Sequence, residues 1–199
     1  MIGGLNEKDD LELVKQSREG DQGAFSVLVS RYKEKAVKMA ALIVGNFEDA
    51  KDVSQEAFVK AYNALAKFEG KSKFSTWYFS ILMNTARDFT RKKSWQMTVK
   101  WSDQEKMDNF FEQVRDENAK PMDVMAGKEL GKRMTSAISD LPEKQKWVFT
   151  LRFMEEMSLK EIAEVTGMQE GTVKANLHFA IQKFKDEMLV SDFSSRKEK

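Results

Sequence analysis

Apolar residues recur at intervals of three and four along most of the chain, whereas no convincing stretch shows the period of two that marks a strand. This pattern predicts helices at about residues 9–19 and 22–45, and another at about 75–93 after the short polar loop EGKSK. The fold class expected is therefore all-α.

A further helix is expected to begin at Asn46, which is a good N-cap residue. Glu48 and Asp49 then lie in its first turn, where the helix dipole favours acidic side chains. The apolar residues at helical spacing are Val53, Ala57, Ala61, Ala64 and Leu65. The polar side chains left facing solvent are Asp49, Asp52, Glu56 and Lys60.

The middle of the chain is polar and weakly periodic, which indicates a linker with a short helix around Phe110 and Phe111. A second helical unit follows it. The organisation expected is two small helical domains joined by a flexible acidic linker: residues 8–94, the linker at 95–125, and residues 126–190.

The C-terminal domain carries two capping-box patterns, Asp140 with Glu143 and Ser158 with Glu161. The first predicts a helix that runs to about Glu156. Gly167 suits the left-handed conformation that ends a helix and turns the chain. Residues 158–184 are therefore predicted to form a helix-turn-helix.

The second helix of this pair has an apolar stripe at offsets of four, three and four: Val173, Leu177, Ala180 and Phe184. Six residues are directed away from that stripe: Thr172, Lys174, Ala175, His178, Phe179 and Gln182. Thr172 and Lys174 near the helix start can hold phosphates, and His178 or Gln182 can meet base edges. The pattern favours DNA binding, with a packed helical hairpin as the alternative reading.

The 199 residues suffice for one large or two small domains, and the composition, 41% hydrophobic and 33% charged, is typical of a globular protein. The absence of cysteine removes disulfides, zinc knuckles and thiol nucleophiles, and it fits a reducing cytosol. No apolar run approaches the ~20 residues of a membrane span, and the start lacks a signal-peptide pattern. A cytoplasmic location without membrane insertion is expected.

The net charge of +1 is unevenly distributed. Residues 67–101 carry a net charge of +6, and residues 102–129 carry −4. Aromatic rings interleave with the basic block: Phe68, Phe74, Trp77, Tyr78, Phe79 and Phe89. Single-stranded nucleic acid is bound by such a combination, because bases stack on rings while cations neutralise phosphates. About half of these rings are expected in the core, with the loop positions the better candidates for contact.

Three segments together resemble bacterial RNA polymerase sigma factors of the extracytoplasmic-function (ECF) group. They are NFEDAKDVSQEAFVKAYNAL, KFEGKSKFSTWYFSILMNTARDFTRKK and LPEKQKWVFTLRFMEEMSLKEIAEVTGMQEGTVKANLHFAIQKF, in the family's order and spacing. The resemblance implies that the first domain binds the polymerase clamp and the -10 promoter element. It implies that the second binds the polymerase flap and the -35 element. The partners implied are core polymerase, promoter DNA and an anti-sigma factor.

The resemblance also assigns roles by position. Four residues match the family's clamp-docking helix: Asp49, Asp52, Gln55 and Glu56. Eight match or flank the region that melts and captures the -10 element: Phe68, Lys71, Ser72, Lys73, Trp77, Asn84, Arg87 and Arg91. Seven match the helix that reads the -35 element: Glu170, Gly171, Thr172, Lys174, Asn176, His178 and Phe179.

The chain departs from the family pattern in both DNA-facing helices. Relatives often read GTVKSRLHRAR and YRIARN where this chain has GTVKANLHFAI and FSILMN. The fold expected is unchanged, but the loss of two or three phosphate contacts predicts weaker promoter binding with a flatter salt dependence.

Three other classes of function are weighed. A sigma-like regulator would bind polymerase or an anti-sigma protein without directing initiation, with Phe179 and Ile181 in a protein interface. An enzyme is disfavoured, since His178 is the single histidine and no glycine-rich phosphate loop is present. A helical adaptor leaves the basic and acidic blocks unexplained. No cofactor, metal or small-molecule substrate is expected.

Overall fold

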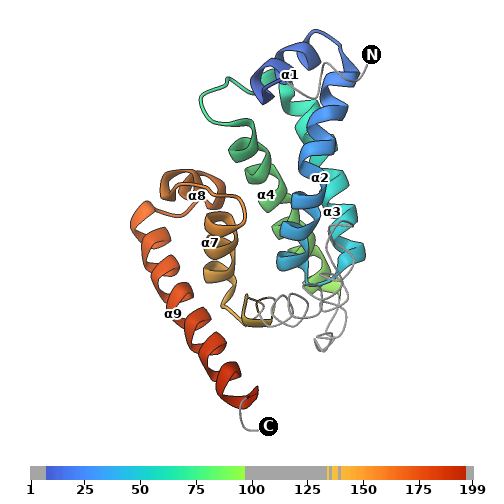
Figure 1. Ribbon diagram of the computed structural model, residues 1–199. Helices are drawn as coiled ribbons and strands as arrows, with labels where there is room; N and C mark the ends of the chain where they lie inside the picture. The colour runs from blue at the N-terminus through green and yellow to red at the C-terminus, as the bar shows by residue number, and fades with distance from the viewer. Residues whose placement is uncertain (1–7, 97–133, 135, 139, 196–199) are drawn as a thin grey trace, which may run out of the picture. The chain divides into compact units, whose positions relative to one another are not determined.

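The computed structural model describes residues 8–96, 134, 136–138 and 140–195. Regular structure in this part of the chain is entirely helical, as predicted, and it forms two compact units, one built on α1–α4 and the other on α7–α9 (Figure 1). Most of the predicted linker, with the helix expected around Phe110 and Phe111, lies outside the described residues.

The first unit begins with two capped helices. Its α-helices are α1 (Asp10–Arg18), α2 (Gln22–Val44), α3 (Phe47–Ala64) and α4 (Phe74–Gln96), with the 3-10 helix η1 (Leu65–Lys67) after α3. Asp9 caps α1 by accepting a hydrogen bond from the Glu12 backbone N–H at 2.8 Å. Asp21 caps α2 in the same way, so the turn predicted between the two helices is present.

The start of α3 agrees with the sequence prediction. The Asn46 side chain accepts a 2.9 Å hydrogen bond from the Asp49 backbone N–H, and Gly45 ends α2 in the left-handed conformation with φ 84°. Val53, Ala57 and Ala61 are fully buried, so the predicted apolar stripe of α3 faces the core.

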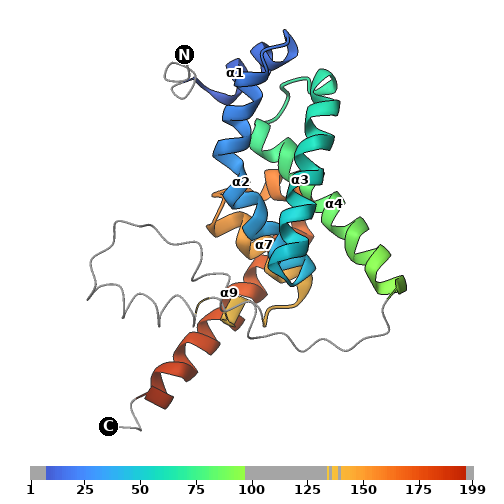
Figure 2. The same ribbon diagram turned by 90° about the vertical axis from the view of Figure 1, so that its right-hand side faces the viewer.

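Helices α2 and α3 run side by side, and α4 packs against both (Figure 2). Aromatic rings fill the centre of this unit. The ring of Tyr78 stacks on Phe58 with a centroid separation of 4.4 Å, and Tyr32 contacts Phe74, Tyr78 and Phe79. Each such ring contributes about 1.5–3 kcal/mol through burial, so this cluster is a major stabilising feature of the unit.

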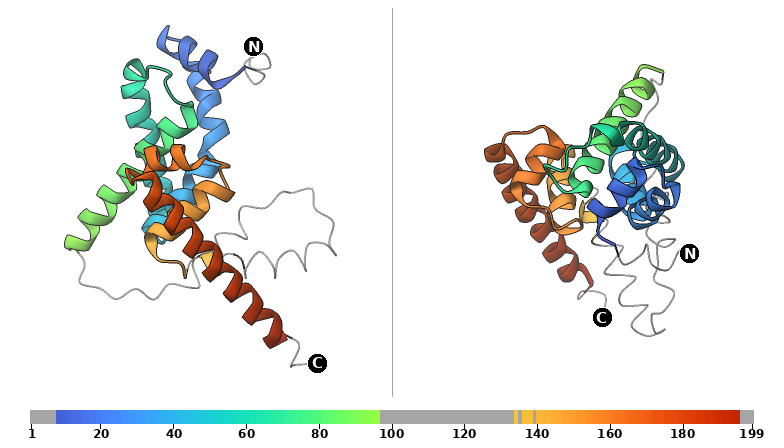
Figure 3. Two further views of the ribbon diagram at one scale, coloured as in Figure 1. Left: turned by 90° about the vertical axis from the view of Figure 1, so that its left-hand side faces the viewer. Right: turned by 90° about the horizontal axis from the view of Figure 1, so that it is seen from above.

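The second unit comprises α7 (Glu143–Phe153), α8 (Leu159–Thr166) and α9 (Glu170–Ser195). Helix α9 packs against α7, with the rings of Phe149 and Phe184 4.9 Å apart, and then runs on beyond α7 and α8 (Figure 3). Ser158 and Glu161 form the predicted capping box, and Gly167 ends α8 with φ 71°. The predicted helix-turn-helix is therefore formed.

The predicted start and end of α7 are both wrong. Asp140 does not cap α7, because Leu141 precedes a proline and is thereby disfavoured from the helical conformation. The helix starts at Glu143 with Pro142 as N-cap. It ends at Phe153 rather than near Glu156, which lies in the left-handed region with φ 54°.

Candidate polymerase and DNA interfaces

The acidic side of α3 presents three of the four residues predicted to dock on polymerase. Asp52, Gln55 and Glu56 are exposed, and Glu56 forms a 2.7 Å ion pair with Lys60 one turn on. Such exposed pairs are weak, so they leave the side chains able to exchange partners. This face can meet a basic protein surface.

Asp49, the fourth residue, is committed to the fold rather than pointing to solvent as predicted. Its carboxylate is bonded to the Asn46 amide at its own helix start and to the ammonium of Lys93 on α4. Partial burial opposes ionisation of Asp49, but the hydrogen bonds from Lys93 and Asn46 outweigh it and hold its pKa below the usual value. Asp49 thus ties α3 to α4, and it is not part of the free acidic face.

An apolar groove of about 450 Å³ lies between α2 and α3, next to Gln55. Its walls include Phe25, Val29, Phe58, Val59 and Tyr62. Val59 and Tyr62 are among the few large apolar side chains of the first unit that the structure leaves exposed. This groove was not predicted from the sequence, although the apolar residues on the polar side of α3 are a signal that indicates it.

The loop between η1 and α4 presents two cations. Lys71 and Lys73 are exposed, and Gly70 between them and Phe68 has φ 72°, a conformation that favours glycine. Lys71 pairs with its near neighbour Glu69 in an exposed contact, which competes weakly with an incoming phosphate. Ser72 in the same loop is partly exposed.

Four of the predicted -10 residues share one side of α4. Trp77, Asn84 and Arg91 are spaced by seven residues, and Arg87 lies between the last two at helical spacing. Asn84 and Arg91 are exposed and Trp77 is partly exposed, while Tyr78 and Leu82 point into the core. Loop and helix therefore form one surface with cations, an amide and a ring.

Phe68 does not belong to that surface. It is only 4% exposed, and its ring packs 5.0 Å from Trp77 and 6.2 Å from Phe74. The expectation that loop aromatics are the better contacts is wrong here, because the ring closes the core under the loop. Of the other rings in the basic block, Phe74, Tyr78 and Phe79 are also buried, which leaves Trp77 and Phe89.

Helix α9 presents the outward face that its periodicity predicts. All six residues predicted to point away from the core are exposed: Thr172, Lys174, Ala175, His178, Phe179 and Gln182. Phe179 is 56% exposed and its ring lies 5.7 Å from that of His178. At the helix start Glu170 and Gly171 are exposed too, and a Cβ on Gly171 would meet no heavy atom within 4 Å. The first turn is open to a large ligand.

Asn176 differs from its neighbours on α9. Its side-chain amide donates a 2.8 Å hydrogen bond to the carbonyl of Thr172 one turn earlier. This hydrogen bond would have to break before the Asn176 amide could bond to a base. Asn176 is therefore the weakest of the seven predicted -35 residues.

Among the described residues, no group of three or more His, Asp and Glu side chains is arranged to hold a metal ion. In the same part of the chain no helix has both the length and the apolarity needed to cross a bilayer. The features that stand out are an acidic face, a basic face with a ring, and a helix-turn-helix, which together define a DNA-binding transcription factor.

Comparison with known proteins identifies the family. The sequence profile of Sigma-70 region 2 matches residues 28–96, and that of Sigma-70 region 4 matches residues 132–184. The ECF RNA polymerase sigma factor SigW of Bacillus subtilis is 34% identical over 167 residues, covering 83% of this chain and 89% of that protein. The ECF RNA polymerase sigma-E factor of Escherichia coli is 34% identical over 169 residues, covering 84% and 88%. The chain belongs to the ECF sigma factors of the sigma-70 family.

Solved structures agree in fold. CnrH, determined in complex with the cytosolic domain of CnrY, matches with a TM-score of 0.62 and 27% identity, covering 92% of this chain and 98% of that one. The sigma factor RpoE of Bartonella quintana, determined in complex with the anti-sigma factor NepR, matches with a TM-score of 0.65 and 17% identity, covering 83% and 97%.

Proposed function

We propose that this protein directs RNA polymerase to promoters, reading the -35 element with α9 and melting the -10 element with the loop and outer side of α4. The observation that carries the proposal is that both family regions are present in order. Each also presents a face suited to its task. The family consists of transcription initiation factors, so the proposed function requires no catalytic residue. The proposed location is the cytoplasm, where the polymerase and the chromosome are.

Docking on the polymerase clamp is assigned to Asp52, Gln55 and Glu56. Their exposure supports this assignment, and the apolar groove beside Gln55 adds contact area that a purely acidic face would lack. Charge complementarity then steers the encounter, while burial of the groove contributes to the lifetime of the complex.

Melting is assigned to Lys71, Ser72, Lys73 and the α4 side chains Trp77, Asn84, Arg87 and Arg91. Extruding a base costs a few kcal/mol. Stacking on an exposed ring returns about 1–3 kcal/mol per base, and the lysines hold the adjacent phosphates. Trp77 is the ring on this side of α4 that remains partly exposed, so it replaces Phe68 as the proposed stacking partner.

Reading of the -35 element is assigned to Glu170, Gly171, Thr172, Lys174, His178 and Phe179, with Asn176 in a lesser role. The open first turn of α9 can bring its backbone N–H groups to a phosphate, which is the usual way a recognition helix is seated. Phe179 replaces an arginine of the family pattern and offers the apolar contact that a thymine methyl takes.

The test is transcription reconstituted from core polymerase and the full-length protein on a randomised promoter library. We expect the transcribed templates to be enriched in a common two-part sequence, with transcripts starting downstream of it. Deleting either part should abolish the enrichment. Transcription without any sequence preference would overturn the proposal.

A second candidate is a sigma-like regulator that binds polymerase without selecting promoters, and the 56% exposed Phe179 favours it. An anti-sigma factor is a proposed partner under both readings, since the sigma factor RpoE, which shares this fold, was determined in complex with the anti-sigma factor NepR. The second candidate predicts tight polymerase binding but no sequence enrichment in the same library experiment.

A further inference from the structure

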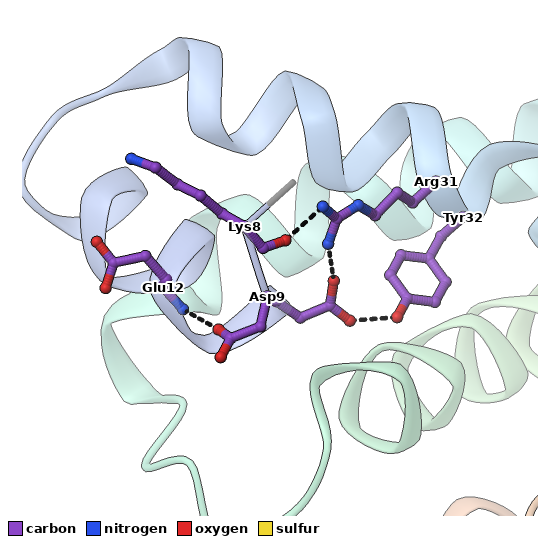
Figure 4. Close-up of polar contacts among 6 residues, drawn as sticks. Lys8, Asp9, Glu12, Arg31 and Tyr32 are labelled. Atoms are coloured by element: carbon purple, nitrogen blue, oxygen red, sulfur yellow. Dashed lines mark hydrogen bonds and ion pairs between the residues drawn. The ribbon is translucent and has the colours of Figure 1, made fainter. Parts of the chain in front are cut away.

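Helix α1 lies before the segment that matches Sigma-70 region 2, which begins at residue 28. Its start is bonded to α2 (Figure 4). Arg31 donates to the Asp10 carboxylate at 2.7 Å and to the Lys8 carbonyl, and the Tyr32 hydroxyl donates to the same carboxylate. Burial and the adjacent Asp10 carboxylate raise the pKa of Tyr32, so this phenol remains a proton donor. The start of α1 is thus fixed to the core.

The last residue of α1 holds a different part of the unit. The Arg18 guanidinium donates to the carbonyl of Leu65 at 3.0 Å and to that of Ala66 at 2.9 Å. It also donates to the carbonyl of Phe68. Leu65 and Ala66 belong to η1, and Phe68 is the residue at which the loop to α4 begins.

A cation is stabilising at this segment, although it is not the segment's sole donor. The Leu65 carbonyl also accepts a 3.1 Å hydrogen bond from the Phe68 backbone N–H. The carbonyls at a helix end keep spare acceptor capacity and carry the negative end of the helix dipole, so a cation placed there adds stability. Arg18 supplies that cation from another helix. A guanidinium can reach three carbonyls at once because its donors lie in a fixed plane. The direction in which the chain leaves η1 is therefore set from α1.

Leu11, in the first turn of α1, lies close to the loop as well. A Cβ built on Gly70 would lie 3.9 Å from a methyl carbon of Leu11, so α1 borders the loop beyond its root. The packing of α1 itself rests on Leu13 and Val14, which are buried. Removing the Arg18 side chain therefore leaves α1 docked and releases only the loop root.

We propose that Arg18 is a positioning residue for -10 melting, acting through the loop of residues 68–73 that carries Lys71 and Lys73. The proposal rests on the assignment of that loop to -10 DNA. Arg18 itself does not contact the DNA. It holds the root of the loop so that the two lysines and Trp77 face the strand together, which lowers the ordering cost of binding.

The first experiment needs no DNA. Hydrogen exchange of the full-length protein is compared for wild type, Arg18→Ala, Arg18→Lys and Lys15→Ala, which removes an exposed charge from the same helix. We expect Arg18→Ala to raise exchange about 5-fold or more at the loop root, where the Phe68 backbone N–H is bonded to the Leu65 carbonyl at 3.1 Å, while α2 and α3 stay protected. Arg18→Lys should restore part of the protection, because an ammonium can still donate to these carbonyls. Unchanged exchange in the loop for Arg18→Ala would overturn the proposal.

The second experiment measures binding of reconstituted holoenzyme to single-stranded -10 DNA as a double-mutant cycle. Arg18→Ala should weaken binding about 5-fold alone, yet less than 2-fold when Lys71 and Lys73 are already alanine, because it acts through them. Equal losses in both backgrounds contradict the positioning role. If the variant with Lys71→Ala and Lys73→Ala binds normally, the loop is not the -10 contact and its assignment fails. The hydrogen-exchange experiment still tests the role of Arg18 in that case. If Arg18→Ala does not fold, Arg18→Lys is carried through the same cycle.

Discussion

The two units differ in how far the residues expected to touch partners are free to do so. In the second unit every side chain predicted to point outward from α9 is exposed, and Asn176 alone among the assigned residues is turned back to its own helix. In the first unit Phe68 closes the core and Asp49 ties two helices together. A functional surface built from several helices shares its residues with the fold, whereas a single recognition helix does not.

The cause lies in how many neighbours each helix has. Helix α9 packs one stripe against α7, so helical periodicity alone separates its buried side from its free side. Helices α3 and α4 each pack against two other helices, and their ends meet through a contact between residues 44 positions apart. Periodicity does not register such a contact.

The largest effect is expected from the acidic face of α3. Replacing Asp52 and Glu56 with lysine should weaken binding to core polymerase on the order of 100-fold, because like charges opposed across an interface cost several kcal/mol. Helical content should not change, since both side chains are exposed. Binding is measured by titration of labelled protein into core polymerase.

The matched control reverses two exposed acids in the other unit, Asp186→Lys and Glu187→Lys, with the same change in net charge. These should leave polymerase affinity within a factor of two or so. A similar loss for both pairs would show that net charge, not the α3 face, governs docking.

The next effect separates the cations of the loop from the ring beneath it. Replacing Lys71 and Lys73 with alanine should reduce binding to single-stranded -10 DNA about 10- to 30-fold at 0.1 M salt, since each phosphate contact contributes a salt slope of about 0.7. Open complexes on duplex promoters should be lost, with partial recovery on a template mismatched at -10. Potassium permanganate footprinting measures the melting.

Two comparisons sharpen this result. Lys15→Ala with Lys35→Ala removes the same charge from α1 and α2 and should have little effect on melting. Phe68→Leu should instead lower stability by about 1–2 kcal/mol, because it leaves a cavity under the loop. Equal defects of the lysine variant on duplex and mismatched templates would indicate a docking or folding fault.

The sequence alone predicted the helix ends whose signals are local. Asn46, Ser158 and Gly167 each act within three or four residues of the backbone they cap. Asp140 does not cap α7 because Pro142 restricts the residue before it, a local effect that competes with the capping pattern. The Asp49–Lys93 contact and the Arg18 contacts to residues 65–68 could not be predicted, since they depend on how helices distant in sequence pack.

A smaller effect is expected in the second unit, where an arginine of the family pattern is replaced by Phe179. Phe179→Arg should tighten binding to a duplex -35 site about 5- to 8-fold at 0.1 M salt and steepen the salt dependence by about 0.9, the gain of one phosphate contact. Affinity measured across a salt series tests both numbers. The control is Phe153→Arg, the same change at the end of α7, where the Phe153 side chain is 54% exposed. Tighter binding with an unchanged slope would mean that the arginine does not reach a phosphate.

The smallest effect concerns Asp49, whose pKa is held below its usual value by Lys93 and Asn46 against the opposing effect of burial. A depressed carboxyl pKa stabilises the fold above the unfolded-state value of about 3.9, and this contribution is lost as the pH falls through the folded-state pKa. Asp49→Asn should therefore cost about 0.5–1 kcal/mol at pH 7, the range of a partly exposed ion pair, and progressively less as the pH falls through the folded-state pKa. Urea unfolding across that pH range measures the difference, with Asp52→Asn as the same change on the exposed side of α3. Carbon-detected NMR titration of the Asp49 carboxyl measures its pKa directly. A midpoint at the usual value would mean that Asp49 does not join α3 to α4 and belongs instead to the exposed acidic face of α3.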